Sequence, residues 1–218
     1  AADNAKLWQP WASGGTSFWD TGNKGATSVG DSNSLPTTET SNGSGKAACL
    51  ESKFIVIKFA AGNLFTGTYK RTDGTNGVLD FGRPFTSFPS KLRFQYKYTC
   101  QTIDKVGDDA MSHLKGRPDS CQVFIALTDW DQPLEIRTRP SERQLFDPSD
   151  PHVIAYGELI KGETVSNWTQ ADVELQYRYK NRTPKYIVIV ACSSKYGDYF
   201  TGGTGSKLWL DECELIYE

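Results

Sequence analysis

Residues 92–98 read LRFQYKY, and this stretch decides the fold class. Its Leu, Phe and two Tyr side chains fall on one parity, and the Arg, Gln and Lys between them fall on the other. Such period-two alternation is typical of a β-strand that buries one face and exposes the other. Residues 173–179, VELQYRY, alternate in the same way. Both segments therefore predict strands that cover a core with one face and meet solvent with the other.

Apolar runs extend the strand pattern along the chain. FIVIKF at 54–59, QVFIALT at 122–128 and YIVIVAC at 186–192 are continuous and of strand length, which predicts buried strands. Shorter runs at 134–138 and 152–156 add two more strands. About eight strands with turn signals between them, and no convincing helical period, predict an all-β fold: a two-sheet antiparallel β-sandwich or jelly roll.

The final strand contains a change of phase. Leu208 and Leu210 share one parity, whereas Cys213 and Leu215 share the other. One extra residue in a strand reverses the face on which the following side chains lie. The sequence therefore predicts a β-bulge near Asp211.

Length and composition indicate one domain. The chain has 218 residues, of which 38% are hydrophobic and 23% charged. These values predict a single β-sandwich domain over residues 1–218, with enough apolar side chains for a sizeable core. Residues 1–50 are rich in Gly, Ser, Thr and Asn, with Trp and Phe among them, which predicts a loop-rich N-terminal segment packed on the sandwich.

The charge balance narrows the class of partner. Lys plus Arg number 24 and Asp plus Glu 26, which gives a net charge of −2. A nearly neutral chain lacks the positive surface that nucleic acid or an anionic membrane attracts. We therefore expect no nucleic-acid partner, and a ligand that is uncharged or bound through local contacts.

The N-terminus and the hydrophobic runs lead us to expect an exported protein. The only methionine is Met111, so we expect that a leader has been removed. The longest apolar run, residues 186–192, is far shorter than the roughly 20 residues of a membrane span. We expect an extracytoplasmic location (periplasmic, outer-membrane surface or secreted), and a lipid anchor or further domain ahead of residue 1 is compatible with the sequence.

Five cysteines are present, and none forms a CxxC pair, which argues against a zinc or redox site. Cys100 closes one strand pattern and Cys121 opens the next, so a disulfide could join them if the two strands are hairpin partners. The alternative is that the cysteines are small buried hydrophobic residues.

Most catalytic signatures are missing. The chain has no G-x-S-x-G elbow, no phosphate-binding glycine loop and only two histidines. Asp129 and Asp131, which flank Trp130 at a strand end, are the remaining catalytic candidates, since paired carboxylates can hydrolyse glycosidic bonds. The alternative is a solvated polar strand end, and we expect a protein without catalysis of its own.

Three loop segments combine aromatic rings with carboxylates or amides. Rings stack on the C–H faces of sugars, and carboxylates and amides bond to the hydroxyl groups. The alternative for Trp19 and Trp130 is that each plugs an end of the sandwich. The predicted ligand-binding residues are Trp19, Asp20 and Asn23 in the first segment, Asp129, Trp130 and Asp131 in the second, and Lys195, Tyr196, Asp198 and Tyr199 in the third.

The same loops suggest a structural metal. Asp20, Asn23 and Asp211 offer the hard oxygen ligands that calcium prefers. A calcium ion on these residues would tie the N-terminal loop to the last strand. No EF-hand loop is present, and we expect no required cofactor.

Seven segments between residues 18 and 217 form a recognisable pattern. They are FWDTGN from Phe18, GRPFTSFPSKL from Gly82, DSCQVFIALTDW from Asp119, VIAYGEL from Val153, PKYIVIV from Pro184, SSKYGDYFTGG from Ser193 and GSKLWLDECEL from Gly205. Together they resemble the putative carbohydrate metabolism domain, a family of bacterial surface and exported proteins. The resemblance implies a jelly-roll (galactose-binding-like) sandwich similar to carbohydrate-binding modules, and it implies no catalytic residues.

These observations lead to one expected function and two alternatives. We expect an extracytoplasmic domain that binds an oligo- or polysaccharide and takes part in bacterial polysaccharide capture or metabolism. A glycoside hydrolase acting through paired carboxylates is the first alternative. A structural or adhesive cell-surface module, whose loops contact protein, is the second.

Overall fold

The alternating stretch at residues 92–98 lies within β9 (Lys91–Thr99) of the computed structural model, which describes residues 6–12 and 14–217. β9 belongs to an antiparallel five-stranded sheet of order β13–β9–β16–β3–β2. Its neighbours are β13 (Val165–Glu174), β16 (Lys207–Ile216), β3 (Ala47–Glu51) and β2 (Ser34–Thr37).

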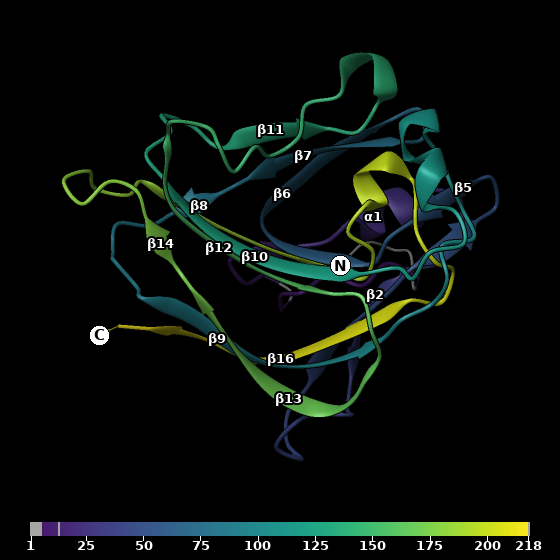
Figure 1. The fold of residues 1–218 in the computed structure, drawn as a ribbon, viewed down its shortest axis with the longest axis horizontal. Coiled ribbons are helices and arrows are strands. Elements are labelled where there is room, and N and C mark those ends of the chain that lie inside the picture. Colours follow the sequence, from purple (N-terminus) through teal and green to yellow (C-terminus); the bar gives the residue numbers. More distant parts are fainter. Residues whose placement is uncertain (1–5, 13, 218) are drawn as a thin grey trace.

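The second sheet is antiparallel and nine-stranded, and it lies over the first (Figure 1). Its main path runs in the order β11–β7–β6–β15–β10–β12–β14, while β1 pairs with β6 and β8 pairs with β15. The strands are β1 (Trp19–Asp20), β6 (Asn63–Asp73), β7 (Asn76–Phe81), β8 (Arg83–Pro84), β10 (Cys121–Thr128), β11 (Leu134–Arg137), β12 (Val153–Lys161), β14 (Gln176–Tyr177) and β15 (Tyr186–Cys192). The predicted two-sheet antiparallel sandwich is confirmed, and its jelly-roll connectivity stays a prediction.

The core between the sheets follows the predicted alternation. Leu92, Phe94, Tyr96 and Tyr98 of β9 are all buried and pack in one cluster with apolar side chains of the opposite sheet. Burial of such aromatic and aliphatic side chains contributes about 1.5–3 kcal/mol each. The period-two pattern therefore reports correctly which face of β9 meets the core.

The nine-stranded sheet also has apolar side chains on its outer face. Phe65, Phe124 and Val188 belong to a second cluster, which Phe146 covers from the segment after β11. Because both faces of β10 and β15 are apolar, these strands appear in the sequence as continuous hydrophobic runs. This outer face carries the site described below.

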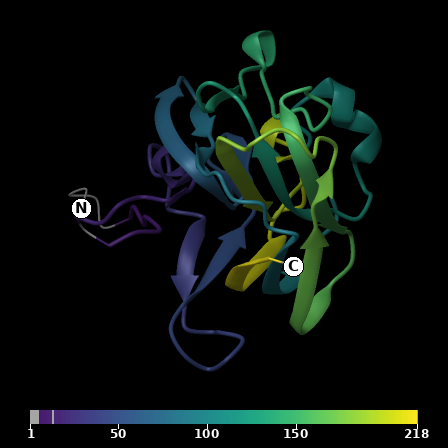
Figure 2. The ribbon, with the colours of Figure 1, turned by 90° about the vertical axis from the view of Figure 1, so that its left-hand side faces the viewer.

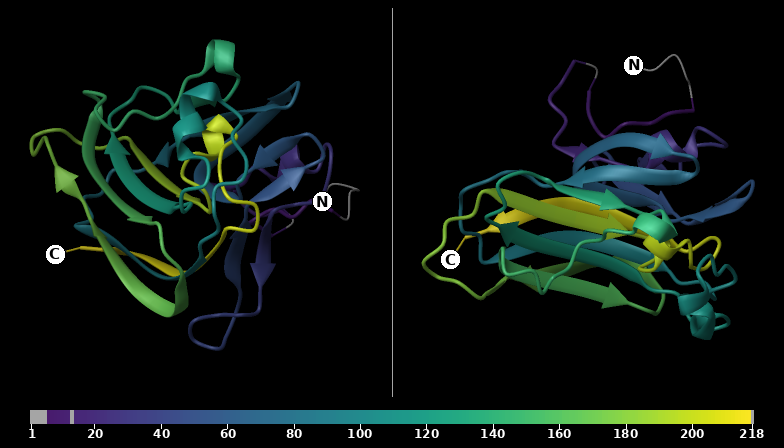
Figure 3. Two further views of the ribbon diagram at one scale, coloured as in Figure 1. Left: turned by 45° about the vertical axis from the view of Figure 1, so that its right-hand side comes forward. Right: turned by 90° about the horizontal axis from the view of Figure 1, so that it is seen from above.

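In the part of the chain that the structure describes, four short helical turns lie in the connections: α1 (Asn23–Ala26), η1 (Asp109–Leu114), η2 (Pro140–Glu142) and η3 (Gly197–Tyr199). The described part of the N-terminal segment lies along one side of the sandwich (Figures 2 and 3) and joins it through β1, β2 and β3. Within the described ranges, no helix is long and apolar enough to cross a membrane.

The apolar run at residues 54–59 is a hairpin, and the prediction of one buried strand there is wrong. β4 (Lys53–Ile55) pairs with β5 (Lys58–Ala60) around a tight turn at Val56, whose φ is 53°. Ile55 and Phe59 point inward, whereas Val56 and Ile57 are 69% and 68% exposed. An apolar run of this length fits a buried strand, and no turn-forming residue marks the reversal.

The predicted bulge in the last strand is confirmed. The pairing of β16 with β9 shifts register between Asp211 and Glu214, and Glu212 has a φ of 50°. The extra residue explains why the apolar parity changes partway along the strand.

The cysteines are not bridged, since all five are free. The Cys100 thiol donates a hydrogen bond to the Asp119 carbonyl oxygen at 3.2 Å, and Cys121 is fully buried in the sandwich core. The Cys100–Cys121 disulfide is therefore absent from this structure, and Cys121 fits the alternative of a small buried hydrophobic residue.

Candidate functional site

A pocket of about 500 Å³ opens on the outer face of the nine-stranded sheet. The middle strands of this sheet form its floor, and β5, η3 and the 145–148 segment form its walls. A cavity of this size is within the range of small-molecule sites, which are concave and largely apolar with a few placed polar groups.

Two cross-strand rows of side chains make the floor. Asn63, Cys192 and Gln122 lie opposite one another on β6, β15 and β10 and give a polar row. Two residues along each strand, Phe65, Val190 and Phe124 give an apolar row, which Glu158 of β12 completes. All seven residues line the pocket. The strand pairing therefore sets a polar strip beside an apolar strip, because side chains two apart on a strand share a face.

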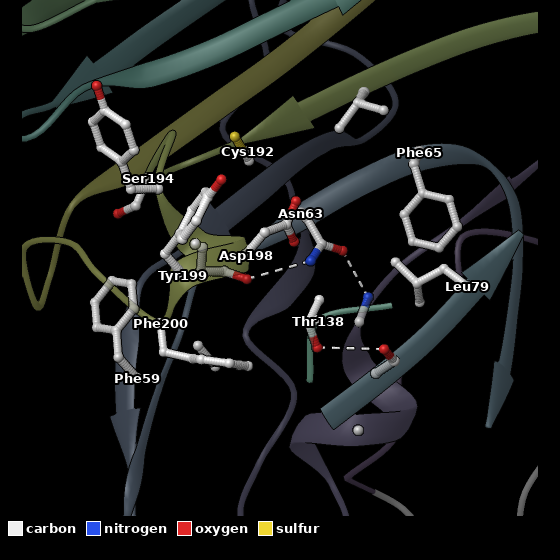
Figure 4. Close-up of a pocket in the computed structure, with 18 of the residues that line it drawn as sticks. Phe59, Asn63, Phe65, Leu79, Thr138, Cys192, Ser194, Asp198, Tyr199 and Phe200 are labelled. Atoms are coloured by element: carbon white, nitrogen blue, oxygen red, sulfur yellow. Dashed lines mark hydrogen bonds between the residues drawn. The ribbon is translucent and has the colours of Figure 1, made fainter. Parts of the chain in front are cut away.

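The segment after β15 supplies a wall of aromatic rings. Tyr196, Tyr199 and Phe200 line the pocket, and Figure 4 shows Tyr199 and Phe200 on the side opposite Phe65. The Arg143 guanidinium lies 4.4 Å from the Tyr199 ring centre, and the Lys58 amine lies 3.4 Å from that of Phe200. Phe200 adopts a left-handed conformation (φ 52°) at the end of η3.

A buried polar network anchors this wall to the sandwich. The Asp119 carboxylate accepts hydrogen bonds from the Ser194 hydroxyl at 2.5 Å and from the Gly203 N–H at 2.8 Å. The Ser194 hydroxyl also meets that of Ser52 at 2.6 Å. Asp119, Ser194 and Ser52 are fully buried, so their polar groups depend on one another for hydrogen bonds. The network fixes both ends of the loop that carries the rings.

Two carboxylates line the pocket, Asp198 and Glu158. Asp198 is exposed at the mouth of the pocket. Desolvation by the atoms packed around it nevertheless raises its pKa to about 6, although the Arg143 charge opposes the shift. It makes no hydrogen bond or ion pair with any residue that the structure describes. Glu158 accepts a hydrogen bond from the Gln122 side-chain amide at 2.7 Å.

The third predicted binding segment lies at this pocket. Lys195, Tyr196, Asp198 and Tyr199 all line it, so one stretch of the chain places four predicted residues together. Figure 4 shows Asp198 and Tyr199 close to Asn63, on the same side of the cavity. Their role as ligand-binding residues stays a prediction.

The second predicted segment lies elsewhere, and its charges are already paired. Asp129 forms an ion pair with Arg182, and its carboxylate accepts a hydrogen bond from the His152 ring at 2.8 Å. Burial raises the Asp129 pKa, but its hydrogen bonds to Arg182 and His152 outweigh burial and lower it. The hydrogen bond from Lys185 lowers the pKa of Asp131. Trp130 is buried in the outer-face cluster, which fits the alternative of a ring that plugs the sandwich.

The first predicted segment acts in the fold of the N-terminal region. The Asp20 carboxylate accepts hydrogen bonds from the Thr21 and Tyr69 N–H groups at 2.8 and 2.7 Å. The Asn23 amide bonds to backbone groups of residues 8, 33 and 34. Trp19 is partly buried and packs against the sandwich core. None of the three lines the pocket.

The three candidate calcium ligands lie on different elements. Asp20 lies on β1 beside the nine-stranded sheet, whereas Asp211 lies on β16 of the other sheet and accepts hydrogen bonds from Ser41. The side-chain oxygens of Asp20, Asn23 and Asp211 are occupied by backbone or hydroxyl donors. Among the described residues, no group of three or more His, Cys, Asp or Glu side chains could hold a metal ion. The calcium site stays a prediction.

Several pocket residues were missed in the sequence. Gln122 is the first residue of a continuous apolar run, and Glu158 stands between Gly157 and Leu159, so each resembles an ordinary polar position on a strand. Phe59 and Lys58 belong to the run misjudged as one strand. The hydrophobic pattern along a strand indicates which of its side chains face outward. It does not indicate which part of the outer face other segments leave uncovered.

Comparisons with known proteins agree with this architecture. Residues 4–216 match the family described as putative carbohydrate metabolism domain. A crystal structure of a putative glycoside hydrolase from Bacteroides thetaiotaomicron superposes with a TM-score of 0.71 at 22% identity, covering 92% of this chain and 63% of that one. A putative glycoside hydrolase from Bacteroides vulgatus gives 0.69 at 21% identity, with 96% and 90% covered. At these identities the likeness shows a shared fold. No curated protein matches the chain.

Proposed function

The chain belongs to the putative carbohydrate metabolism domain family, and on that premise we propose that it binds an oligo- or polysaccharide in the pocket of the nine-stranded sheet. The observation that carries the proposal is the wall formed by Tyr196, Tyr199 and Phe200 beside the polar row Asn63 and Gln122. Rings and hydrogen-bonding groups face one cavity, which is the combination that sugar recognition needs.

The chemistry of the pocket suits an uncharged sugar. A pyranose presents apolar C–H faces and hydroxyl groups that both donate and accept hydrogen bonds. Aromatic rings match the C–H faces, while amide and carboxylate groups match the hydroxyls. The four charged residues that line the pocket, Lys58, Lys195, Glu158 and Asp198, balance in sign. Because the positive and negative side chains of the lining are equal in number, the pocket does not favour a strongly charged ligand.

The proposed setting is extracytoplasmic, in the capture or metabolism of bacterial polysaccharide. The family and the sequence expectation of export support this setting. Fractionation of producing cells tests it: the protein should appear in the periplasm, at the outer surface or in the medium. Recovery in the cytoplasm alone contradicts it.

Binding is tested directly with a glycan array followed by calorimetric titration of each hit. Tyr196→Ala removes one ring of the wall and should weaken binding about tenfold, since ring contacts contribute on the order of 1 kcal/mol or more. The matched control is Phe88→Ala, because Phe88 is an exposed ring that does not line the pocket. The control should bind as the unaltered chain does.

Two results would overturn the proposal. A folded chain that binds no glycan on a broad array contradicts carbohydrate binding. Equal loss of affinity in Tyr196→Ala and Phe88→Ala, with unchanged unfolding, places the binding surface outside the pocket.

A further inference from the structure

The outer face of the five-stranded sheet carries two tryptophans in one cross-strand row. Trp209 of β16 pairs with Lys97 of β9 on one side and with Cys49 of β3 on the other. The pairing of β13 with β9 contains a register shift, and this irregular stretch places Trp168 beside Lys97. None of these four residues lines the pocket, which opens on the other sheet. The row is therefore a separate surface.

The alternation of the strands sets this row on the side away from the core. Trp209 stands between Leu208 and Leu210, which are buried between the sheets, so its indole points outward. Lys97 alternates with buried tyrosines of β9 in the same way. Figure 1 shows β9, β13 and β16 at the outside of the molecule, with the nine-stranded sheet over their other face. The row is thus on the outside of the sandwich.

One lysine lies between the two indoles. The Lys97 amine is 5.6 Å from the ring centre of Trp168 and 4.9 Å from that of Trp209. Cation–π contacts of this kind hold rings in place, and both indoles stay partly exposed. Because β9 separates β13 from β16 in the sheet, the two rings are two strand spacings apart, which is roughly 10 Å. The pair therefore offers two aromatic surfaces at a set spacing.

The charges beside the rings are neutralised within the protein. Lys97 forms an ion pair with Glu39, from the loop between β2 and β3. Lys207, whose amine lies 5.6 Å from the Trp209 ring centre, pairs with Glu51 at 3.4 Å. Paired charges attract neither an acidic nor a basic polymer over distance. The row therefore suits an uncharged ligand.

Amide side chains lie next to the aromatic row. Side chains two apart on a strand share a face, so Gln95 of β9 points outward beside Lys97, and Gln170 of β13 lies opposite it. The Gln95 side chain is partly exposed and makes no hydrogen bond with any residue that the structure describes. An amide both donates and accepts hydrogen bonds, as sugar hydroxyls do. Gln95 is therefore available to a sugar that stacks on the neighbouring rings.

We propose that this face is a second carbohydrate-binding surface, which holds an extended chain of uncharged sugars across the strands. Trp168 and Trp209 stack on the C–H faces of two pyranoses, and Gln95 bonds to their hydroxyl groups. The ring spacing is about the length of two linked pyranoses, so the indoles contact alternate sugars of one chain. This surface takes the same class of ligand as the pocket but does not depend on it.

Affinity gel electrophoresis measures the proposed binding, with the folded chain run through gels that each contain one soluble polysaccharide. The neutral probes are hydroxyethyl cellulose, xylan, galactan and galactomannan, and polygalacturonate is the acidic comparison. At least one neutral polymer should retard the unaltered chain, and polygalacturonate should not. Trp168→Ala and Trp209→Ala should each weaken that binding about tenfold. Phe88→Ala, which removes an exposed ring outside the row, is the control and should bind as the unaltered chain does.

Oxidation by N-bromosuccinimide gives a measurement on the unaltered chain, which does not depend on the folding of a variant. Mass spectrometry of peptides follows the oxidation of each tryptophan with and without the polymer that retards the chain. Trp168 and Trp209 should be oxidised several-fold more slowly when the polymer is present. Trp8 is the internal control, because it is 49% exposed and lies outside the row. Equal rates with and without polymer at Trp168 and Trp209 contradict the proposal.

The outcomes separate this surface from the pocket. If polymer binding is unchanged in both tryptophan variants, the surface is refuted, whatever the pocket binds. If both variants weaken polymer binding while Tyr196→Ala changes the affinity for no oligosaccharide, the surface stands and the pocket proposal fails. A folded chain that none of the neutral polymers retards contradicts the surface even if a short oligosaccharide binds in the pocket. Retardation by polygalacturonate alone contradicts the uncharged ligand.

Discussion

Two segments of this chain look alike in sequence and behave differently in the fold. Thr128-Asp-Trp-Asp131 follows β10, and Ser193–Phe200 follows the neighbouring antiparallel strand β15, so they lie at opposite ends of the sheet. Each sets aromatic rings beside carboxylates. In the first segment, cations hold the carboxylates and the ring is buried. In the second, the rings line a pocket and Asp198 is unpaired.

The difference shows that neighbouring elements, and not local composition, decide what such a segment does. Arg182 and Lys185 come from the strand connection beside Asp129 and Asp131 and neutralise both carboxylates. No cation approaches Asp198 closely enough to pair with it among the described residues. The segment at β10 is therefore tied into ion pairs and the core, whereas the segment at β15 leaves its rings and Asp198 at a pocket.

Truncating the ring of each segment should give the sharpest contrast. Trp130→Ala should lower the free energy of unfolding by about 3–5 kcal/mol, because it leaves a cavity in the cluster that includes Phe146. Tyr196→Ala should lower it by under about 1 kcal/mol, because that ring is partly exposed in the pocket. Urea unfolding measures both values. Equal losses would contradict the assignment of one ring to the core and the other to the pocket.

The next largest effect on stability should come from the buried polar network around Asp119, which anchors the pocket segment. Asp119→Ala leaves the buried Ser194 hydroxyl and Gly203 N–H without their acceptor and should cost about 2–3 kcal/mol. It should also weaken ligand binding, because these bonds fix the loop that carries Tyr196 and Tyr199. Asp131→Ala is the control and should change neither property, since its side chain is 95% exposed. A stable Asp119→Ala variant with full affinity would show that the network is dispensable.

The ion pairs of Asp129 and Asp131 in the first segment should contribute less to the free energy of unfolding. Asp129→Asn keeps a hydrogen-bonding oxygen but loses the charge that pairs with Arg182, at an expected cost of about 1–2 kcal/mol. Asp131→Asn removes a solvated pair with Lys185 and should leave the free energy of unfolding nearly unchanged. Thermal unfolding at low and high salt compares the two. A larger loss for Asp131→Asn would reverse the expected order.

The fold could be predicted from sequence where apolar and polar residues alternate regularly along a strand. The alternation at residues 92–98 marks the buried face of β9, and the phase change near Asp211 marks the bulge of β16. Both follow from the two-residue repeat of a strand, which is a local property. The hairpin at Val56 carries no such signal, because a β-branched residue at positive φ is rare and no glycine or asparagine announces the turn.

The site could be predicted only in part. Tyr196 and Asp198 stand out because rings and acids cluster in a loop beside glycine. Glu158 and Gln122 could not be predicted, because their place in the pocket depends on which region of the outer face the 139–150 segment leaves open. Pairing of Asp129 with Arg182 was equally hidden, since the two lie 53 positions apart in the chain. Strand order and covering segments are decided by the whole fold.

Stability should also shift with pH, in opposite directions for the carboxyls of the two segments. The folded-state pKa of Asp198 is about 6, above the usual 3.8, so its contribution to stability is complete below about pH 4 and is lost as pH rises through 6. The stability of Asp198→Asn should therefore rise relative to that of the unaltered chain as pH rises from 4 to 7. Asp129 has a lowered pKa, so its contribution is present above about pH 4 and is lost as pH falls through its folded-state value.

The free energy of unfolding of Asp129→Asn should accordingly be furthest below that of the unaltered chain near pH 7, and the difference should become smaller toward pH 3. Urea unfolding of the three proteins at several pH values between 3 and 7 measures both curves. If the two variants follow the same pH trend, Asp198 is not the desolvated, unpaired carboxyl that separates the pocket segment from its ion-paired counterpart. Opposite trends would support the contrast between the two segments, because the pKa of Asp198 is raised and that of Asp129 is lowered.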